Sequence, residues 1–300
     1  MKTHLLTDQE KLEKVIATCG ISRSELARRL AVSYKTVYRW LDKGVAPHPS
    51  QSRDIDQLYK DYVDLREAVL KLREKLGDPL KALQGDKKVR DKFVLELTYH
   101  SNAIEGGRMT IRETEAAFLG KRVRGKELFE VLEAINHKNA LEFLLESARP
   151  GFQIDQNYIL KLHEKTMYNF NSDLPGKYRT GPVNLANSEK VFPPAQEVPL
   201  LMGRLVKEIN HYGEDPIGKI AHDHYDFEAI HPFFDGNGRV GRLLLITQLL
   251  SQNLAPAIFE IKDRYKYYLA LSKADLGGFQ GLIQLLCESI IKGYELLSGE

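Results

Sequence analysis

The sequence predicts an all-α protein. Residues 10–43 contain three short amphipathic helical patterns, and from residue 86 onward hydrophobic residues recur at helical spacing nearly throughout, with caps and short breaks between segments. Residues 176–194 are the exception, because they are too rich in Gly and Pro for a helix and instead fit a short β-hairpin. The 300 residues, 43% of them hydrophobic, suffice for one or two domains with a sizeable core.

Residues 1–48 have the pattern of a separate basic domain. They hold nine Lys or Arg against five Asp or Glu, whereas the rest of the chain holds 34 against 36. Residues 22–30 and 34–41 have the pattern of two capped helices, with Ala31 in the turn where Gly is usual. This resembles a helix-turn-helix of the phage-repressor type, whose second helix enters the major groove of DNA. The DNA-facing residues would be Ser33, Tyr34, Lys35, Thr36 and Arg39. The alternative is a three-helix cap that packs on a partner or on the rest of the chain.

Residues 49–85 are predicted to be a linker and a long connecting helix. One Gly and two Pro prevent a helix over residues 44–52. A regular alternation of three- and four-residue spacings then runs through the apolar residues Ile55, Leu58, Tyr62, Leu65, Val69, Leu72 and Leu76. This spacing fits one long helix packed on the chain's own core, and equally the seam of a homodimer that would pair two basic heads.

Residues 231–242, His-Pro-Phe-Phe-Asp-Gly-Asn-Gly-Arg-Val-Gly-Arg, are the most informative segment. They lead directly into an apolar run with helical spacing, and a helix N-terminus presents free N–H groups that suit phosphate. Gly236 and Gly238 allow the backbone to approach an anion closely. Because Arg239 and Arg242 lie three residues apart, a helix would place both guanidinium groups on one face, where they could clamp phosphate oxygens.

Two further residues of this segment have suitable chemistry for a nucleotide reaction. Asp235 offers the carboxylate oxygen that Mg²⁺ prefers beside substrate phosphates. His231 can accept a proton near neutral pH. Each residue type alone is common in structural roles. Their ordered combination before an apolar helix predicts a nucleotide site.

The segment resembles the signature of the Fic (filamentation induced by cAMP) family, His-Pro-Phe-x-Asp/Glu-Gly-Asn-Gly-Arg-x-x-Arg, without departure. The resemblance covers roughly residues 90–295 and implies a bundle of about eight helices with a β-hairpin flap. It also implies transfer of AMP from ATP to a Ser, Thr or Tyr hydroxyl of a target protein. The implied site consists of the base His231, the Mg²⁺ (or Mn²⁺) ligand Asp235, the anion-hole residues Gly236, Asn237 and Gly238, and the phosphate-binding Arg239 and Arg242.

The same resemblance assigns three neighbouring features. Related Doc proteins, which phosphorylate their targets, carry Lys where this chain has Gly238, so AMP transfer is favoured. Tyr268 corresponds to a tyrosine beside the adenine, although packing in the core explains it equally well, and Asp275 stands where relatives often have an Asn that contacts the base. Residues 181–194 correspond to the flap, which docks the target protein as an added strand.

Residues 101–106, Ser-Asn-Ala-Ile-Glu-Gly, end a helix predicted at about residues 87–106. A carboxylate at a helix C-terminus opposes the helix dipole, so Glu105 needs a cation from elsewhere. The segment resembles the inhibitory motif Ser/Thr-x-x-x-Glu-Gly/Asn of self-inhibited Fic proteins, with Ser101 and Glu105 as its inhibitory residues. The resemblance implies that Glu105 pairs with Arg242 and blocks placement of the γ-phosphate. In some relatives this glutamate aligns a water that removes AMP.

These observations leave two classes of function open for the chain, whose residues 86–300 would form the Fic catalytic domain. The first is a self-inhibited AMP transferase that uses ATP; the second is a DNA-binding transcriptional regulator whose Fic core senses nucleotide. A transferase that uses another nucleotide donor is a third option. The intact base and metal ligand favour the first. Two cysteines exclude a disulfide framework, and the lack of a signal peptide or an apolar run long enough to span a membrane predicts a cytoplasmic protein.

Overall fold

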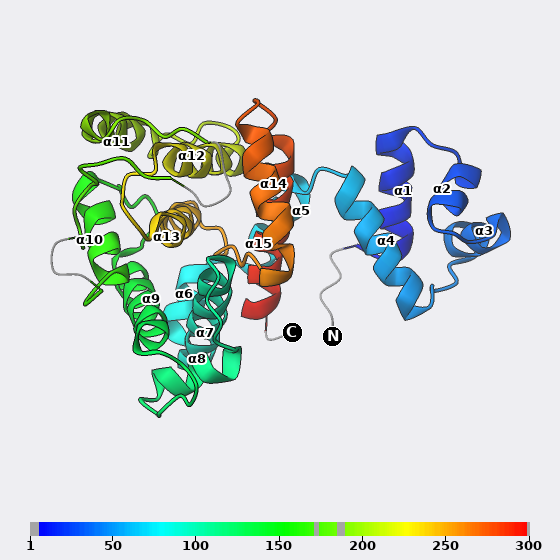
Figure 1. Cartoon of the computed structure of the whole chain (residues 1–300). Helices are drawn as coiled ribbons and strands as arrows, with labels where there is room; N and C mark the ends of the chain where they lie inside the picture. Colours follow the sequence, from blue (N-terminus) through cyan, green and yellow to red (C-terminus); the bar gives the residue numbers. More distant parts are fainter. Residues whose placement is uncertain (1–5, 171–173, 185–189, 299–300) are drawn as a thin grey trace. The chain divides into compact units, whose positions relative to one another are not determined.

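The computed structural model describes residues 6–170, 174–184 and 190–298 (Figure 1). Within these ranges the chain forms α-helices and two short 3₁₀ helices and no strand, which confirms the predicted all-α class. The chain divides into two compact units between Leu72 and Arg73.

The first unit contains the predicted pair of helices and two others that pack with them. Its helices are α1 (Asp8–Cys19), α2 (Arg23–Arg29), α3 (Tyr34–Lys43) and α4 (Pro49–Tyr62), followed by the first part of α5 (Arg66–Leu76). A small apolar core holds them together, made of the buried side chains Leu12, Val15, Leu26, Val37 and Trp40.

The turn between α2 and α3 has the form that the sequence predicts. Ser33 caps α3 by accepting a hydrogen bond from the Thr36 N–H at 3.1 Å. Ala31 adopts φ 52°, the left-handed region in which Gly is favoured, so this turn stores strain of about 1–2 kcal/mol. Ala31 therefore adopts the left-handed conformation that Gly usually supplies at this turn.

The prediction of one long connecting helix is wrong. α4 ends at Tyr62 and α5 begins at Arg66, because the Asp64 carboxylate accepts hydrogen bonds from the N–H and the guanidinium of Arg66 and so starts a new helix. The regular apolar spacing belongs to two helices whose apolar faces are buried within the chain; Ile55, Leu65 and Val69 are completely buried. Of the seven positions, Tyr62 and Leu76 are exposed, so the repeat does not form the continuous exposed seam that the homodimer interpretation needs.

The boundary expected near residue 48 also lies further along the chain. α4 packs against α1, and two polar contacts fix the pair. The Lys11 ammonium contacts the Asp56 carboxylate at 2.6 Å, and the Ser52 hydroxyl donates to Asp8 at 2.7 Å. The first unit therefore extends to Leu72.

The second unit is a bundle around α13 (Asn237–Ser251), which lies among α7, α9, α10 and α12 (Figure 1). Its α-helices are α6 (Pro79–Gly85), α7 (Lys87–Ile104), α8 (Ile111–Phe118), α9 (Leu128–Ser147), α10 (Gln156–Thr166), α11 (Val198–Glu208), α12 (Pro216–Ile230), α13, α14 (Arg264–Ala274) and α15 (Gln280–Leu297). The short 3₁₀ helices Ala195–Glu197 and Ile261–Asp263 precede α11 and α14.

Nearly every side chain of α13 is buried, from Arg239 to Ser251. A helix that is enclosed on all sides cannot shift or fray easily, so its N-terminus is a fixed platform. Although α13 is apolar over most of its length, no helix in the described part of the chain combines the length and apolar character needed to span a lipid bilayer.

The flap is described only in part. Its first arm, residues 181–184, and its second arm, residues 190–194, contain no strand. The turn of the predicted hairpin falls within residues 185–189, which lie outside the described residues. The hairpin therefore stays a prediction.

Candidate functional site

The loop before α13 is closed by its own side chains. The Asn237 side chain accepts a hydrogen bond from the Phe233 N–H at 2.9 Å and donates to the Phe233 carbonyl at 2.8 Å. Gly236 precedes the helix with φ 79°, and a Cβ there would lie 2.9 Å from the Met167 Sδ. The sequence prediction assigned Asn237 to the anion hole, but its side chain instead shapes the loop, so the backbone remains as the donor.

The N-terminus of α13 has the features of an anion site. No side chain caps it, and the first N–H groups of an α-helix have no partner within the helix. The helix dipole adds positive potential at the same point. The Gly236 N–H already donates to the Asp235 carboxylate, so the backbone N–H groups of Asn237 and Gly238 are the ones available for the predicted phosphate contact.

His231 ends α12 and lies at the entrance of this loop. It has φ 50°, and its N–H donates to the Phe227 carbonyl at 3.0 Å. The Phe192 ring stacks on the imidazole at a centroid distance of 4.4 Å. Burial lowers the pKa of His231 to about 4; the charge of Arg179 acts in the same direction, and the hydrogen bond with the Glu228 carbonyl opposes it. The imidazole is therefore neutral at pH 7 and able to accept a proton.

Arg239 has partners that the sequence did not reveal. Its guanidinium contacts the Glu133 carboxylate of α9 at 3.0 Å and the Asp235 carboxylate at 3.2 Å, and only 4% of its side chain is exposed. Glu133 is 106 residues away in the chain and belongs to no recognisable motif. Arg239 therefore supports the loop through two carboxylates, and a direct phosphate contact would require it to exchange one of them.

Asp235 has a carboxylate suited to a divalent cation. Its side chain is 64% exposed, and Oδ1 accepts bonds from the Gly236 N–H and from Arg239. Oδ2 has no hydrogen-bond partner among the described residues. One accessible carboxylate beside a phosphate site is the donor set that Mg²⁺ commonly uses. Asp235 therefore fits the predicted metal ligand.

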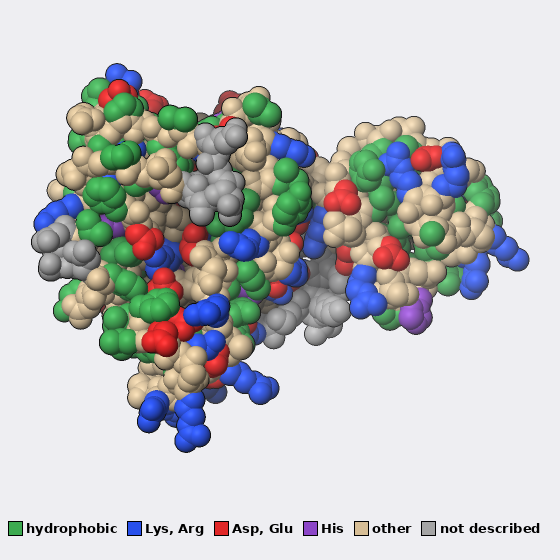
Figure 2. Space-filling model, viewed as in Figure 1, with side chains coloured by type: hydrophobic (Ala, Val, Ile, Leu, Met, Phe, Trp, Pro, Cys, Tyr) green, Lys and Arg blue, Asp and Glu red, His purple; other side chains and the backbone are tan. Residues whose placement is uncertain are grey.

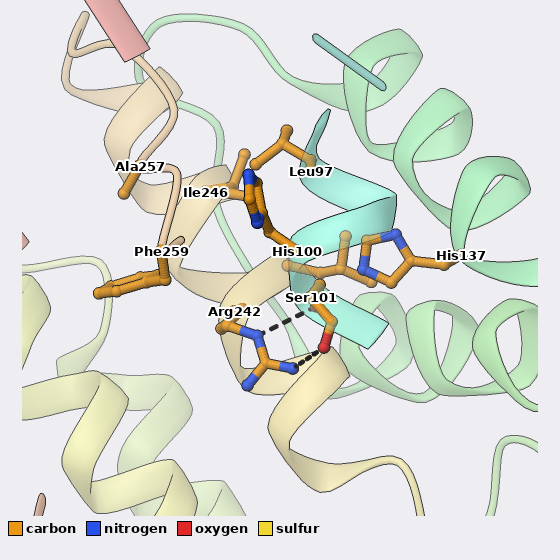
Figure 3. A pocket seen from close by; sticks show the side chains of 9 residues that line it. Leu97, His100, Ser101, His137, Arg242, Ile246, Ala257 and Phe259 are labelled. Carbon is orange, nitrogen blue, oxygen red and sulfur yellow. Dashed lines mark hydrogen bonds between the residues drawn. The ribbon is translucent and has the colours of Figure 1, made fainter. Parts of the chain in front are cut away.

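Arg242 forms the ion pair that the sequence analysis predicts. Its Nη2 lies 2.8 Å from Glu105 Oε1, at the C-terminus of α7. Ser101 accepts two further bonds, at its Oγ from Arg242 Nε and at its carbonyl from Nη2 (Figure 3). The charge of Glu105 raises the pKa of Arg242 although burial opposes this. Ser101 and Glu105 thus satisfy a guanidinium that is only 4% exposed.

The Glu105 carboxylate lies directly against the first turn of α13. A Cβ added to Gly238 would lie 2.1 Å from Glu105 Oε1 and 3.1 Å from Arg242 Nη1. The absence of a side chain at Gly238 therefore makes room for the carboxylate. Glu105 occupies space beside the helix N-terminus where a phosphate group would approach.

A small apolar cavity lies behind this ion pair, with Leu97, His100, Ser101, His137, Ile246 and Phe259 in its wall (Figure 3). Burial lowers the pKa of His137 to about 3, helped by the charges of Arg242 and Arg239. His137 is therefore neutral and shares a hydrogen bond with Thr98 at 3.1 Å. This wall keeps water away from the Arg242 guanidinium and strengthens the charge interaction there.

Glu228 is a second buried carboxyl that no sequence motif identified. It lies on α12, and one side-chain oxygen has no hydrogen-bond partner among the described residues. Burial raises its pKa to about 7, and the negative charge of Glu105 contributes. A buried carboxyl with a raised pKa therefore lies near the Glu105–Arg242 pair.

The residues that the sequence analysis places at or next to the adenine of ATP have different surroundings. Tyr268 is 40% exposed and donates to the Ile104 carbonyl at 3.3 Å, so its ring is accessible beside the end of α7. Tyr267 is buried and bonds His224 at 2.7 Å, which is a core contact. Asp275 accepts from Tyr225 at 2.9 Å and contacts Lys190 of the flap at 2.7 Å, so it fastens the flap.

Part of this site lies in a segment that matches a known family. Residues 153–249 match the family described as Fic/DOC family. The chain carries a Fic domain. The match ends within α13 and includes the whole loop from His231 to Gly236, whereas Ser101 and Glu105 on α7 precede it.

Curated relatives and solved structures of this family resemble a larger part of the chain. "Protein adenylyltransferase Fic" of Nematostella vectensis is 29% identical over 78% of this chain and 54% of its own length. "Protein adenylyltransferase fic-1" of Caenorhabditis briggsae is 31% identical over 67% of this chain and 40% of its own length. The chain therefore spans about half or less of these two relatives.

A solved Fic-domain signalling protein from Bacteroides thetaiotaomicron shares the fold. It superposes with a TM-score of 0.69 over 79% of this chain and 97% of its own, at 22% identity. The arrangement of helices around α13 is thus that of known Fic domains.

Proposed function

We propose that this protein is a self-inhibited AMP transferase, which moves AMP from ATP to a hydroxyl side chain of a target protein. The observation that carries the proposal is the juxtaposition of three groups. A neutral His231 lies at the mouth of the uncapped α13 N-terminus, and the Glu105 carboxylate lies against the same helix turn. The relatives named as protein adenylyltransferases support the same activity.

The reaction uses these groups in a simple order. The His231 imidazole takes the proton of the target hydroxyl, and the hydroxyl oxygen attacks the α-phosphorus of ATP. The bond from the α-phosphorus to the bridging oxygen breaks, and pyrophosphate leaves. The N–H groups at the start of α13 stabilise the charge that develops on the α-phosphate oxygens. Asp235 would hold Mg²⁺ (or Mn²⁺), which supplies charge neutralisation to the phosphates.

Glu105 holds the enzyme in its resting state in this proposal. Its ion pair with Arg242 occupies the guanidinium that would otherwise bind the γ-phosphate. A charge-assisted contact of this kind contributes about 1.5–3 kcal/mol, which corresponds to about ten- to hundredfold in an equilibrium. Removal of the carboxylate should free Arg242 for ATP.

The decisive experiment is transfer of label from α-³²P-ATP with Mg²⁺ to the protein itself and to proteins of a cell lysate. We expect Glu105→Gly to label about ten- to hundredfold more than wild type, and Glu105→Gly/His231→Ala to label nothing. Equal labelling by wild type and Glu105→Gly would contradict self-inhibition. No label from any variant, despite measurable ATP binding, would favour a different donor or a nucleotide-sensing regulator.

The flap is the proposed docking site for the target. Its two described arms line a groove together with Arg179, and Val191 at the second arm is 90% exposed. Phe192 of the same arm stacks on His231, so a segment bound along this arm would bring its hydroxyl next to the base. An extended target segment would pair with the exposed backbone of the arm.

A second proposed function is DNA binding by the first unit. Ser33, Tyr34, Lys35 and Arg39 are exposed on or next to α3, and Figure 2 shows Lys and Arg side chains projecting at the outer edge of this unit. Among the described residues, Lys35 and Arg39 have no acidic partner, whereas Arg23 pairs with Asp42 at 2.6 Å. Unpaired cations on a recognition helix are suited to phosphate contacts.

Fluorescence anisotropy with duplex DNA at several salt concentrations tests this second function. We expect Lys35→Ala/Arg39→Ala to weaken binding and to reduce the slope of log K against log salt by about two, because two phosphate contacts are lost. Arg23→Ala is the matched control, since its charge is already paired within the unit. Wild-type protein that binds no duplex at low salt would support the alternative of a helical cap.

A further inference from the structure

Arg179 is the most completely buried arginine among the described residues, with 2% of its surface exposed, and its contacts are unusual. Its guanidinium donates only to backbone carbonyls. The acceptors are His231 at 2.8 Å from Nε, Gly181 at 3.1 Å from Nη1, and Pro193 at 2.6 Å and Ile230 at 3.4 Å from Nη2. Its own N–H donates to the Pro232 carbonyl at 2.9 Å.

These carbonyls belong to three segments, and the Arg179 side chain binds all of them. Gly181 lies in the first arm of the flap and Pro193 in the second. The carbonyls of Ile230 and His231 end α12 and begin the catalytic loop. One planar guanidinium therefore fastens both arms of the target-docking flap to the peptide of the proposed base, a geometry that the three-donor ammonium of Lys cannot reproduce.

The charge of Arg179 is also unusual because no carboxylate among the described residues compensates it, and burial lowers its pKa. A neutral donor could hold loops together with a smaller desolvation cost. The positive charge has a second effect, however, since it disfavours a proton on His231. Glu105 and Lys190 are the other charged groups that act on His231, and Glu105 acts in the opposite direction.

His231 needs such support because its backbone conformation is strained. A non-glycine residue at φ 50° costs about 1–2 kcal/mol and persists only where its surroundings fix it. The N–H of His231 is held by Phe227 and its carbonyl by Arg179. The backbone of His231 is therefore fixed on one side by α12 and on the other by the side chain that holds the flap. The imidazole that it carries lies against Phe192, with Nδ1 3.4 Å from the Glu228 carbonyl.

We propose that Arg179 is a positioning residue that couples the docking of the target at the flap to the orientation of His231 for AMP transfer. The inference rests on the proposed function. Arg179 touches neither the phosphate-binding turn of α13 nor the Glu105–Arg242 pair in the described contacts. Its loss should therefore impair transfer to a protein hydroxyl far more than it impairs the binding of ATP.

The test uses the full chain with Glu105→Gly as parent, and compares Arg179→Lys with Arg179→Gln. We expect kcat for transfer to fall about 100-fold in both, because misplacement of a base by about 1 Å has that effect, while the Kd for ATP changes less than about twofold. The pH profile separates the two variants. The acid limb of kcat/KM should move to higher pH in Arg179→Gln, which lacks the charge, and stay in place in Arg179→Lys. Arg204→Gln, at an exposed arginine, is the matched control.

Two outcomes would overturn the proposal. Unchanged kcat with an unchanged acid limb in Arg179→Gln would show that the contacts do not position the base. A parallel loss of ATP binding and of thermal stability in both variants would show that Arg179 only maintains the fold. If the parent itself transfers no AMP, the proposed function fails separately. In that case NMR titration of His231 still tests the role of Arg179. The proposal requires that the pKa of His231 rises in Arg179→Gln.

Discussion

Arg242 and Arg179 are both almost fully buried, yet the chain holds them in opposite ways. Arg242 pairs with a carboxylate from another helix and with Ser101. Arg179 binds backbone carbonyls of three neighbouring segments and no carboxylate among the described residues. The first arrangement has a side-chain anion that a phosphate group can replace, whereas carbonyls of the main chain cannot leave. Arg242 thus takes part in a contact that can be exchanged, whereas the contacts of Arg179 are a fixed part of the backbone structure.

The largest expected effect comes from the replaceable contact. Gly238→Ala places a Cβ where the Glu105 carboxylate now lies, so the ion pair must open. We expect the free energy of unfolding to fall by about 3 kcal/mol, because a buried guanidinium loses its counter-charge. In a Glu105→Gly background the same substitution should cost less than about 1 kcal/mol, since alanine is otherwise favoured over glycine in a helix. Urea unfolding measures both.

The control for this cycle is Gly281→Ala in α15, where a new Cβ would meet its nearest neighbour at 4.0 Å. It should not destabilise the protein in either background. Equal costs of Gly238→Ala with and without Glu105 would show that the carboxylate moves aside freely, and the contrast between the two arginines would lose its energetic basis.

A second prediction concerns the buried histidine next to Arg242. The pKa of His137 is about 3 in the native state and about 6.5 in the unfolded chain. As the pH falls below 6.5, the unfolded state takes up a proton that the native state refuses, so the free energy of unfolding decreases. At pH 5 this residue alone should account for about 2 kcal/mol.

His137→Gln should therefore shrink the loss of stability between pH 7 and pH 5 by about 2 kcal/mol, measured by urea unfolding at both values. His163, His224 and His231 also have lowered pKa values and would maintain the remaining slope. His211→Gln, at an exposed position, is the control and should leave the slope unchanged. An identical slope in His137→Gln would mean that this site opens to water before the protein unfolds.

The smallest effect is expected on the flap. The Lys190–Asp275 pair has side chains 23% and 36% exposed, in contrast to 4% for Arg242. Asp275→Asn should change the free energy of unfolding by less than about 1 kcal/mol, because water screens such pairs. A larger loss in urea unfolding would indicate that the flap contributes to the stability of the bundle.

The sequence predicts the local features of this protein well. It predicts less well which side chains, distant in the chain, contact each other. The spacing from His231 to Arg242 is enough to expect a glycine loop that leads into a helix, and the family resemblance indicates the Glu105 pair, which is present at 2.8 Å. No sequence pattern indicates that Arg239 pairs with Glu133, because only the packing of α9 brings the two side chains together. Likewise, the carbonyl contacts of Arg179 depend on where the backbone passes.

In the connecting segment, by contrast, a clear sequence pattern leads to a wrong prediction. Its apolar spacing is continuous through Leu65, and a regular pattern alone predicts one helix. The chain breaks at residues 63–65 because the Asp64 side chain satisfies the start of α5 and because folding α4 back on α1 buries Ile55. The helix start at Asp64 therefore overrides the regular apolar spacing. Only the tertiary structure reveals which of these two sequence signals decides the course of the chain.

The close approach of Gly238 and Glu105 restricts the evolutionary paths open to this protein. A lineage that acquires any side chain at residue 238, such as the Lys of Doc proteins, displaces the carboxylate in the same mutational step. A change of donor chemistry at this position would then pass through an ancestor without the Glu105–Arg242 pair, unless Glu105 had already been replaced. The order of two substitutions, and not only their identity, decides whether such an intermediate is tolerated by its host.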